Sequence, residues 1–233
     1  MPEATYQRRR DQLETYFDHT AVDAWKRLTS EAPVSGIRAT VRAGRDRMRA
    51  TLLKWLPEDL RGARLLDAGC GTGAFAREAA QRGAEVVAVD LSPKLVDFAT
   101  DISRGKHGTG RIDFIVGDMR DPRLGRFDHI VAMDSLIHYK AGDIAAVLAD
   151  FADRAERSIL FTFAPRTPLL ATMHAVGRLF PRTDRAPAIE PVSDIGMRTA
   201  IIRNDTLSSW KATRSERVSG GFYISQAMEL RPR

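Results

Sequence analysis

Apolar and polar positions first form a regular pattern between residues 35 and 56. The apolar residues recur at alternating steps of four and three, so they share one face of a helix: Ile37, Val41, Gly44, Met48, Leu52 and Trp55. The spacing predicts an amphipathic helix that ends before Pro57, which disfavours helical backbone at the residue ahead of it. Residues 1–33 are polar with scattered aromatic side chains. We expect residues 1–57 to form an N-terminal helical cap.

From Arg64 onward, short apolar runs alternate with amphipathic segments. The runs predict five strands, over Arg64–Ala68, Glu85–Val89, Ile112–Val116, His129–Met133 and Ser158–Phe163. The segments between them predict helices over Ala74–Arg82, from Pro93 onward with Ser92 as N-cap, and over Ala141–Arg154. Strands that alternate with helices indicate a parallel sheet with right-handed crossovers.

After Pro165 the pattern changes. We expect an apolar helix over 168–180, a loop over 181–191 and a helix over Asp194–Arg203. Two alternating runs, Trp210–Val218 and Phe222–Leu230, flank Gly220-Gly221 and predict an antiparallel hairpin. The pattern therefore predicts one core domain over 58–233, with an insert at about 166–205. If the domain has a substrate site, we expect this insert to cover it.

Composition excludes several classes of protein. The 233 residues are 43% hydrophobic and 28% charged, which is typical of a soluble globular domain. No apolar run approaches the ~18 residues of a membrane-spanning helix, and the first 20 residues lack the apolar core of a secretory signal. A single cysteine, Cys70, allows neither an internal disulfide nor a multi-cysteine metal site. We expect a cytoplasmic protein without a bound metal.

The charge balance leaves three kinds of partner open. Lys and Arg together number 36 against 30 Asp and Glu, a net charge of +6. Such an excess suits nucleic acid, an anionic membrane surface or a small anionic substrate.

A glycine-rich turn joins the first predicted strand to the helix after it. The turn has the spacing G-x-G-x-G, in Leu65-Leu66-Asp67-Ala68-Gly69-Cys70-Gly71-Thr72-Gly73. A dinucleotide-binding turn would need G-x-G-x-x-G instead. An acid two residues before the first glycine suits a ligand with a cationic ammonium rather than a pyrophosphate. This segment resembles the first motif of class I S-adenosylmethionine-dependent methyltransferases.

That resemblance implies a fold and a cofactor site. The fold is Rossmann-like, with a seven-stranded, mostly parallel sheet and a C-terminal antiparallel hairpin. Asp90 ends the second strand, where the fold binds the ribose hydroxyls, and Gly117-Asp118-Met119 follows the third strand, where it binds the adenine. The implied S-adenosylmethionine site comprises Asp67, Gly69, Cys70, Gly71, Gly73, Asp90, Leu91, Gly117, Asp118, Met119, Met133 and Asp134. Arg42 is a candidate for the cofactor's carboxylate, because a guanidinium suits that group, or it belongs to a solvated basic face.

The segment after the fourth strand narrows the methyl acceptor. It lacks both the Asn/Asp-Pro-Pro-aromatic motif of enzymes that methylate base amines and a cysteine nucleophile for C5 methylation. The low aromatic content, 7%, offers few platforms for base stacking. We therefore expect no nucleic-acid partner.

Three further segments resemble the magnesium-protoporphyrin O-methyltransferases of chlorophyll and bacteriochlorophyll biosynthesis, in their bacterial branch. They are Tyr16-Phe17-Asp18-His19-Thr20 with Trp25, then Arg42-Ala43-Gly44, and then Asp134-Ser135-Leu136-Ile137-His138-Tyr139. The likeness continues through Phe163–Pro168 to Phe222–Ser225. It implies methyl transfer to a propionate carboxyl of Mg-protoporphyrin IX.

The resemblance also suggests catalytic residues and partners. His138, placed after the fourth strand, would orient the carboxylate or take a proton. Tyr16 would hydrogen-bond the substrate or the cofactor. The large, porphyrin-binding subunit of magnesium chelatase and an anionic photosynthetic membrane are possible partners. Methylation of another small molecule, such as a quinol or phenol, and a non-enzymatic cofactor-binding module remain alternatives.

Overall fold

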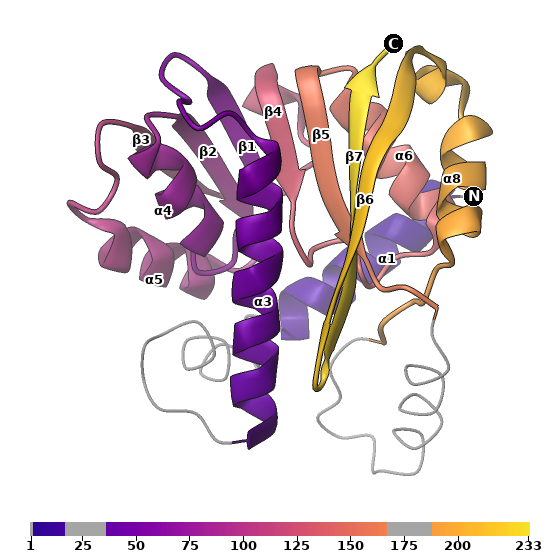
Figure 1. Cartoon of the computed structure of the whole chain (residues 1–233), viewed down its shortest axis with the longest axis horizontal. Coiled ribbons are helices and arrows are strands. Elements are labelled where there is room, and N and C mark those ends of the chain that lie inside the picture. Colours follow the sequence, from indigo (N-terminus) through magenta and orange to yellow (C-terminus); the bar gives the residue numbers. More distant parts are fainter. Residues whose placement is uncertain (1, 17–35, 167–187) are drawn as a thin grey trace.

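One seven-stranded sheet organises the chain (Figure 1). The computed structural model describes residues 2–16, 36–166 and 188–233. The strands are β1 (Arg64–Ala68), β2 (Glu85–Asp90), β3 (Arg111–Val116), β4 (Phe127–Ala132), β5 (Ala155–Phe163), β6 (Trp210–Gly220) and β7 (Tyr223–Pro232), in the order β3-β2-β1-β4-β5-β7-β6. β1 to β5 run parallel, and β7 pairs antiparallel with both β5 and β6. The Rossmann-like sheet with its C-terminal hairpin is thus confirmed.

Helices cover both faces of this sheet (Figure 1). They are α1 (Pro2–Thr15), α3 (Gly36–Trp55), α4 (Ala74–Gln81), α5 (Pro93–Ser103), α6 (Ala141–Ala152) and α8 (Asp194–Ile202), with short 3₁₀ turns η2 (Pro122–Leu124) and η3 (Asp205–Ser209). α5 begins as its sequence predicts: the Ser92 side chain accepts a hydrogen bond from the Leu95 N–H, and Pro93 occupies the first turn.

The two faces of the sheet bury different side chains. Leu66 of β1 and Ile130 of β4 belong to the core shared with α1, α6 and α8, whereas Leu65 and Val131 belong to the core shared with α3 and α4. Adjacent residues of a strand point to opposite faces, so a strand covered on both sides is apolar at most of its positions. This burial explains the continuous apolar runs.

Two strands begin two or three residues earlier than predicted. β4 begins at Phe127 rather than His129, and β5 begins at Ala155 rather than Ser158. Polar residues interrupt the apolar pattern at these starts, but Phe127 and Ala155 still pair across the sheet. Hydrogen bonding to a neighbouring strand extends a strand beyond the limits of its apolar pattern.

One residue of the predicted apolar face of α3 is not buried. Ile37 was expected to be buried, yet it is 57% exposed. The lower end of α3 extends past the sheet, so the helix is buried only from Gly44 onward (Figure 1). A Cβ at Gly44 would lie 2.5 Å from the Tyr223 ring, so glycine here lets α3 approach β7 closely.

The predicted helix at 168–180 and most of the expected insert lie outside the described residues. After them, α8 packs against α6. Among the helices that the structure describes, none combines the length and apolar character needed to cross a membrane.

Candidate functional site

The glycine-rich turn after β1 folds back onto the end of β2. Gly69, Gly71 and Gly73 have φ values of 82°, 54° and 70°, in the left-handed region that favours glycine. A Cβ at Gly69 would lie 2.4 Å from the Ser135 Cβ, whereas open space surrounds the corresponding position at Gly71. The Gly71 N–H donates to the Asp90 carboxylate at 2.8 Å. The turn is therefore held in a shape that leaves room for a ligand beside Gly71.

Asp90 presents a carboxylate at the end of β2. Its two oxygens accept hydrogen bonds from the Gly71 and Ser92 N–H groups, and its burial raises the pKa of the carboxyl. Each carboxylate oxygen has two lone pairs, so acceptor capacity is left for ligand hydroxyl groups.

Asp67 is the most unusual acid of the site. It is 2% exposed, and its Oδ2 is buried without a hydrogen-bond partner among the described residues. Burial, and then the charge of Asp90, raises the pKa of this carboxyl to about 7. A buried, unpartnered carboxylate oxygen is costly and is matched by a cationic donor. Its environment fits the ammonium of S-adenosylmethionine.

Two cavities meet at the carboxyl ends of β1, β2 and β4. The smaller, of about 100 Å³, extends between the ends of β2, β3 and β4 and is closed on one side by Tyr6 and Leu13 of α1. The larger, of about 520 Å³, lies between α3 and α4 and is bordered by Asp67. Arg45, Gly69 and Met133 line both, so they mark the junction.

Most of the predicted site residues lie around these cavities. The smaller is lined by Gly69, Gly71, Asp90, Leu91, Gly117, Asp118, Met119, Met133, Asp134 and His138. The larger is lined by Arg42, Asp67, Gly69, Cys70 and Met133. Gly73 borders neither and packs close to the Phe114 ring. Burial raises the pKa of the Cys70 thiol, which keeps it uncharged.

Tyr16 follows α1, is partly exposed and does not line either cavity, so its catalytic role stays a prediction. Tyr6, which the sequence analysis did not single out, lines the smaller cavity. Tyr6 and Leu13 are both buried and stand seven residues apart, the spacing of one helix face. That spacing was the available signal.

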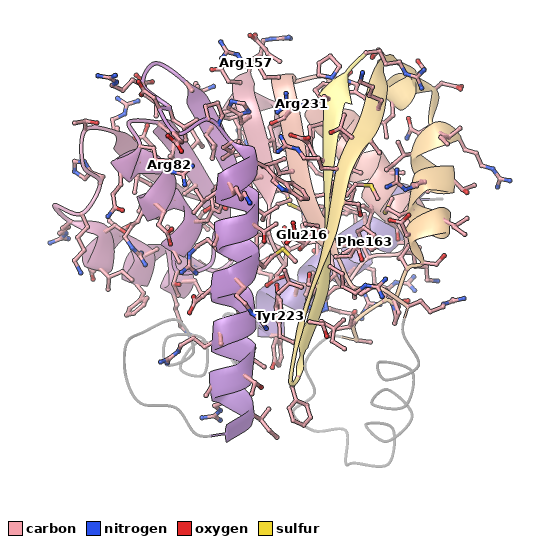
Figure 2. All side chains as sticks on the ribbon, viewed as in Figure 1. Arg82, Arg157, Phe163, Glu216, Tyr223 and Arg231 are labelled. Carbon is pink, nitrogen blue, oxygen red and sulfur yellow. The ribbon has the colours of Figure 1, made fainter. Side chains whose placement is uncertain are left out.

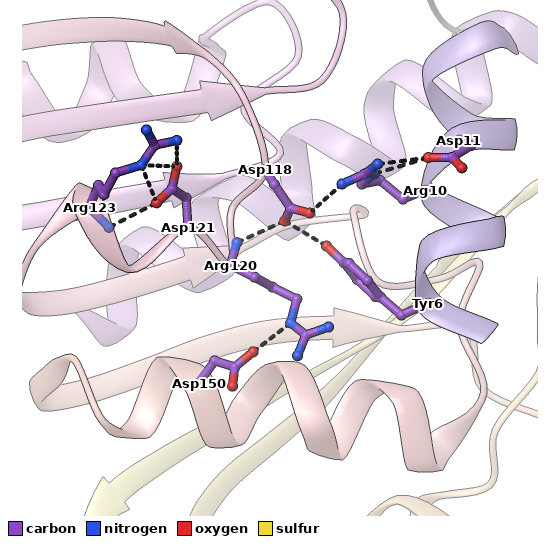
Figure 3. Close-up of polar contacts among 8 residues, drawn as sticks. All are labelled: Tyr6, Arg10, Asp11, Asp118, Arg120, Asp121, Arg123 and Asp150. Carbon is purple, nitrogen blue, oxygen red and sulfur yellow. Dashed lines mark hydrogen bonds and ion pairs between the residues drawn. The ribbon is translucent and has the colours of Figure 1, made fainter. Parts of the chain in front are cut away.

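Tyr6 couples α1 to the end of β3 (Figure 3). Its hydroxyl donates to Asp118 Oδ1 at 2.8 Å, and its ring stacks on Tyr139 with centroids 5.1 Å apart. Burial raises the pKa of the phenol, so it stays protonated and donates. Arg10 approaches the other Asp118 oxygen at 3.4 Å, and the Arg120 N–H donates to Oδ1 at 2.9 Å. α1 therefore covers the smaller cavity beside Asp118.

His138 lies on the wall of the smaller cavity and is 7% exposed. Its Nδ1 is 3.3 Å from the Ala188 carbonyl oxygen. A carbonyl only accepts, so this contact places a proton on Nδ1 and makes Nε2 the basic nitrogen. The Glu190 N–H donates to the Ile137 carbonyl at 2.9 Å, so the chain at 188–190 runs beside this segment.

Asp134 has a left-handed backbone, with φ of 56°. Its carboxylate accepts hydrogen bonds from Arg45 Nη1 at 2.9 Å and from the Tyr223 hydroxyl at 2.9 Å, and lies 3.3 Å from the hydroxyls of Ser225 and Thr162. Figure 2 shows Tyr223 between α3 and the hairpin. Donors from α3, β5 and β7 thus engage both carboxylate oxygens, a network that sequence spacing does not reveal.

Within the described residues, no group of three or more His, Cys, Asp or Glu side chains is arranged to hold a metal ion.

Comparison with known proteins gives concordant results. Residues 132–232 match the family model "Magnesium-protoporphyrin IX methyltransferase C-terminus", and residues 65–156 match "Methyltransferase domain". The chain is 47% identical over 224 residues to the magnesium-protoporphyrin O-methyltransferase of Rhodobacter capsulatus, covering 96% of each chain. The corresponding Synechocystis protein is 28% identical over 217 residues, covering 92% of each chain. The solved structure of magnesium protoporphyrin IX methyltransferase from Synechocystis with bound SAH superposes with a TM-score of 0.84 at 26% identity, covering 97% of this chain and 100% of that one.

Proposed function

The chain belongs to the magnesium-protoporphyrin IX methyltransferase family, and from this premise we propose that it methylates a propionate carboxyl of Mg-protoporphyrin IX. The product is the monomethyl ester of (bacterio)chlorophyll biosynthesis. The observation that carries the proposal is the pair of joined cavities. One end holds an unpartnered buried carboxylate, Asp67, and the other holds His138.

S-adenosylmethionine supplies an electrophilic methyl group: a carboxylate oxygen forms the new C–O bond as the C–S bond breaks, and sulfur keeps the bonding electron pair. The side chains around the cavities suit this ligand. Asp90 accepts from the ribose hydroxyls, Asp118 faces the adenine end, and Asp67 pairs with the ammonium. Arg42, on the wall of the larger cavity, pairs with the carboxylate of the amino-acid tail.

The acceptor needs little help from a base. A carboxyl with a pKa near ~4.5 is ionised at neutral pH, so the protein's main tasks are to orient it and to exclude water. We propose that His138 meets the propionate through Nε2, because Nδ1 donates to the Ala188 carbonyl. It orients the propionate, and α1 shields the pocket through Tyr6 and Leu13.

The test is incubation of the purified protein with radiolabelled S-adenosylmethionine and Mg-protoporphyrin IX, followed by isolation of the methyl ester. We expect one ester per porphyrin. His138→Ala should reduce turnover about tenfold to a hundredfold while leaving SAH affinity unchanged. A protein that binds SAH but forms no ester, or that methylates a catechol and not the porphyrin, would contradict the proposal.

Two partners belong to the same proposal, the large subunit of magnesium chelatase and an anionic membrane surface. The net charge of +6 and the anionic substrate support both. Part of the basic run on α1 is already used, because Arg9 pairs with Glu190 and Arg10 with Asp118. Flotation with anionic vesicles and co-purification with the chelatase subunit test these contacts. Recovery of the protein without either would count against them and would support a purely cytoplasmic enzyme.

A further inference from the structure

Ser135 carries a second unsatisfied group at the site. Its Oγ is buried and has no hydrogen-bond partner among the residues that the structure describes. A buried hydroxyl without a partner costs free energy, and native proteins retain few of them. Since the folded chain alone does not satisfy this hydroxyl, a bound molecule that supplies an acceptor would remove the cost.

The position of Ser135 identifies which molecule that is. The residue lines the smaller cavity together with His138, and its Cβ presses against Gly69, at the junction with the larger cavity. The cofactor's amino-acid tail has its own polar partners in the larger cavity, where Asp67 lies and Ser135 does not. Ser135 therefore stands where the methyl group would leave the cofactor and meet its acceptor.

The backbone just before Ser135 is held in place by contacts to Asp134. Asp134, directly before it, keeps a left-handed conformation that is uncommon for residues other than glycine. Arg45 and Tyr223 both bind its carboxylate, and the Asp134 N–H donates to the Thr162 hydroxyl at 2.7 Å. These contacts from three elements prevent the turn from relaxing, so the direction of the Ser135 side chain is preset.

We propose that the Ser135 hydroxyl donates a hydrogen bond to the propionate carboxylate that accepts the methyl group. The bond goes to one carboxylate oxygen and leaves the other to attack, while His138 contacts the same carboxylate from its own side of the cavity. No proton is transferred by Ser135, and no covalent bond to it forms. The inference rests on the proposed function and adds a substrate-positioning residue to it.

The experiment compares two serine truncations, Ser135→Ala and Ser158→Ala. Ser158, a buried residue of β5, also has a hydroxyl inside the protein, but that hydroxyl has a partner, His129 Nδ1 at 2.8 Å, and Ser158 borders neither cavity. For each variant we would measure kcat/KM for Mg-protoporphyrin IX, the KM for S-adenosylmethionine, the Kd for SAH, and the Tm of the ligand-free protein.

Opposite results are expected for the two variants. Ser135→Ala should lower kcat/KM for the porphyrin about tenfold to a hundredfold, because a hydrogen bond to a charged group is lost. Its SAH affinity should stay within about twofold, and its Tm should be unchanged or higher, because an unsatisfied group has been removed. Ser158→Ala should lower Tm by roughly 2–4 °C and leave the kinetics unchanged.

Three outcomes would overturn the inference. One is wild-type kcat/KM in Ser135→Ala. Another is an equal loss of SAH affinity, which would assign the hydroxyl to the cofactor. The third is a fall in Tm of the size seen for Ser158→Ala, which would make the hydroxyl structural. Failure of the proposed function is a separate result, since the wild-type protein would then form no porphyrin ester at all.

Discussion

Replacing Asp67 by Asn tests the buried carboxyl whose charge the ligand-free protein does not compensate. The carboxyl accepts one hydrogen bond, from the Ala76 N–H, while Oδ2 has no partner in the described structure. Asn keeps the size and one accepting oxygen, and it replaces the ionisable second oxygen by a neutral NH₂ group. The variant therefore separates the cost of the buried charge in the ligand-free protein from its benefit when a cationic ligand is bound.

The magnitude follows from the raised pKa. A change from 3.8 to about 7 corresponds to about 4 kcal/mol of stability that depends on the proton. Because the folded pKa lies above the unfolded one, this stability is present below pH ~4 and is lost as the pH rises through about 7. The amide in Asp67→Asn does not ionise, so at pH 8 the ligand-free variant should be more stable than wild type, by up to about 4 kcal/mol.

Asp67→Asn, which should stabilise the ligand-free protein, should weaken ligand binding. Loss of a charge-assisted bond to the ammonium should weaken SAH affinity about tenfold to a hundredfold at pH 7.5. In wild type, binding requires the ionised carboxyl, so a pKa of about 7 predicts an affinity gain of roughly eightfold from pH 6 to 7.5. Asp67→Asn should flatten that dependence.

Isothermal titration with SAH at both pH values, in two buffers of different ionisation enthalpy, measures affinity and proton release together. Denaturant unfolding of the ligand-free protein measures the stability change. Asp59→Asn is the matched control, since that carboxylate is exposed and should leave SAH binding unaffected. The reasoning is refuted if the Asp67→Asn variant binds SAH as tightly as wild type, or if wild-type affinity does not change with pH.

Three further predictions concern the fold around the site. Burial lowers the pKa of His129 to about 4. The stability present above pH ~6.5 should therefore be lost as the pH falls, by about 3 kcal/mol near pH 4. Denaturant unfolding measured at a series of pH values should show this loss in wild type and a smaller loss in His129→Gln. Tyr6→Phe should weaken the docking of α1 by about 1.5–3 kcal/mol, seen as faster amide hydrogen exchange confined to residues 2–16, and unchanged exchange would contradict the assigned bond. Gly44→Ala should destabilise by about 1–3 kcal/mol because its Cβ meets the Tyr223 ring, whereas Gly142→Ala, with open space around it, should not; equal Tm values for the two variants would show that α3 can shift.

The pattern of apolar residues and glycines along the chain predicted the central strands and the turn after β1. The central strands appear as apolar runs because both of their faces are covered, whereas the edge strand β3 is largely exposed. The glycine-rich turn is recognisable in the sequence because its backbone requires positive φ at three positions. Asp67 and Asp90 were assigned to one site through the resemblance to class I methyltransferases, and the two residues come together because parallel strands end at the same edge of a sheet. These features depend on neighbours in sequence, or on a rule of topology.

The missed residues share one property, which is that their partners are distant in the chain. Tyr6 meets Asp118 112 residues away, and Asp134 meets both Arg45 and Tyr223 89 residues away. No periodicity links such positions. Tyr16 was proposed because it lies in a segment that resembles the family, and it stays a prediction. Tyr6 was not singled out, because only the docking of α1 brings it to the cavity.

The sequence by itself determined the order of strands and helices, the cofactor turn and the family, because these follow from burial patterns and motifs that each occupy a few consecutive residues. Only the tertiary structure decided which polar groups are satisfied. Asp134 is fully engaged, while Asp67 Oδ2 and Ser135 Oγ are left without partners in the part of the chain that the structure describes. The physical reason is that hydrogen-bond satisfaction depends on which remote segments meet in three dimensions. At the two cavities, the atoms without partners mark where we propose that ligands bind, whereas the third such atom, His129 Nε2, borders neither cavity.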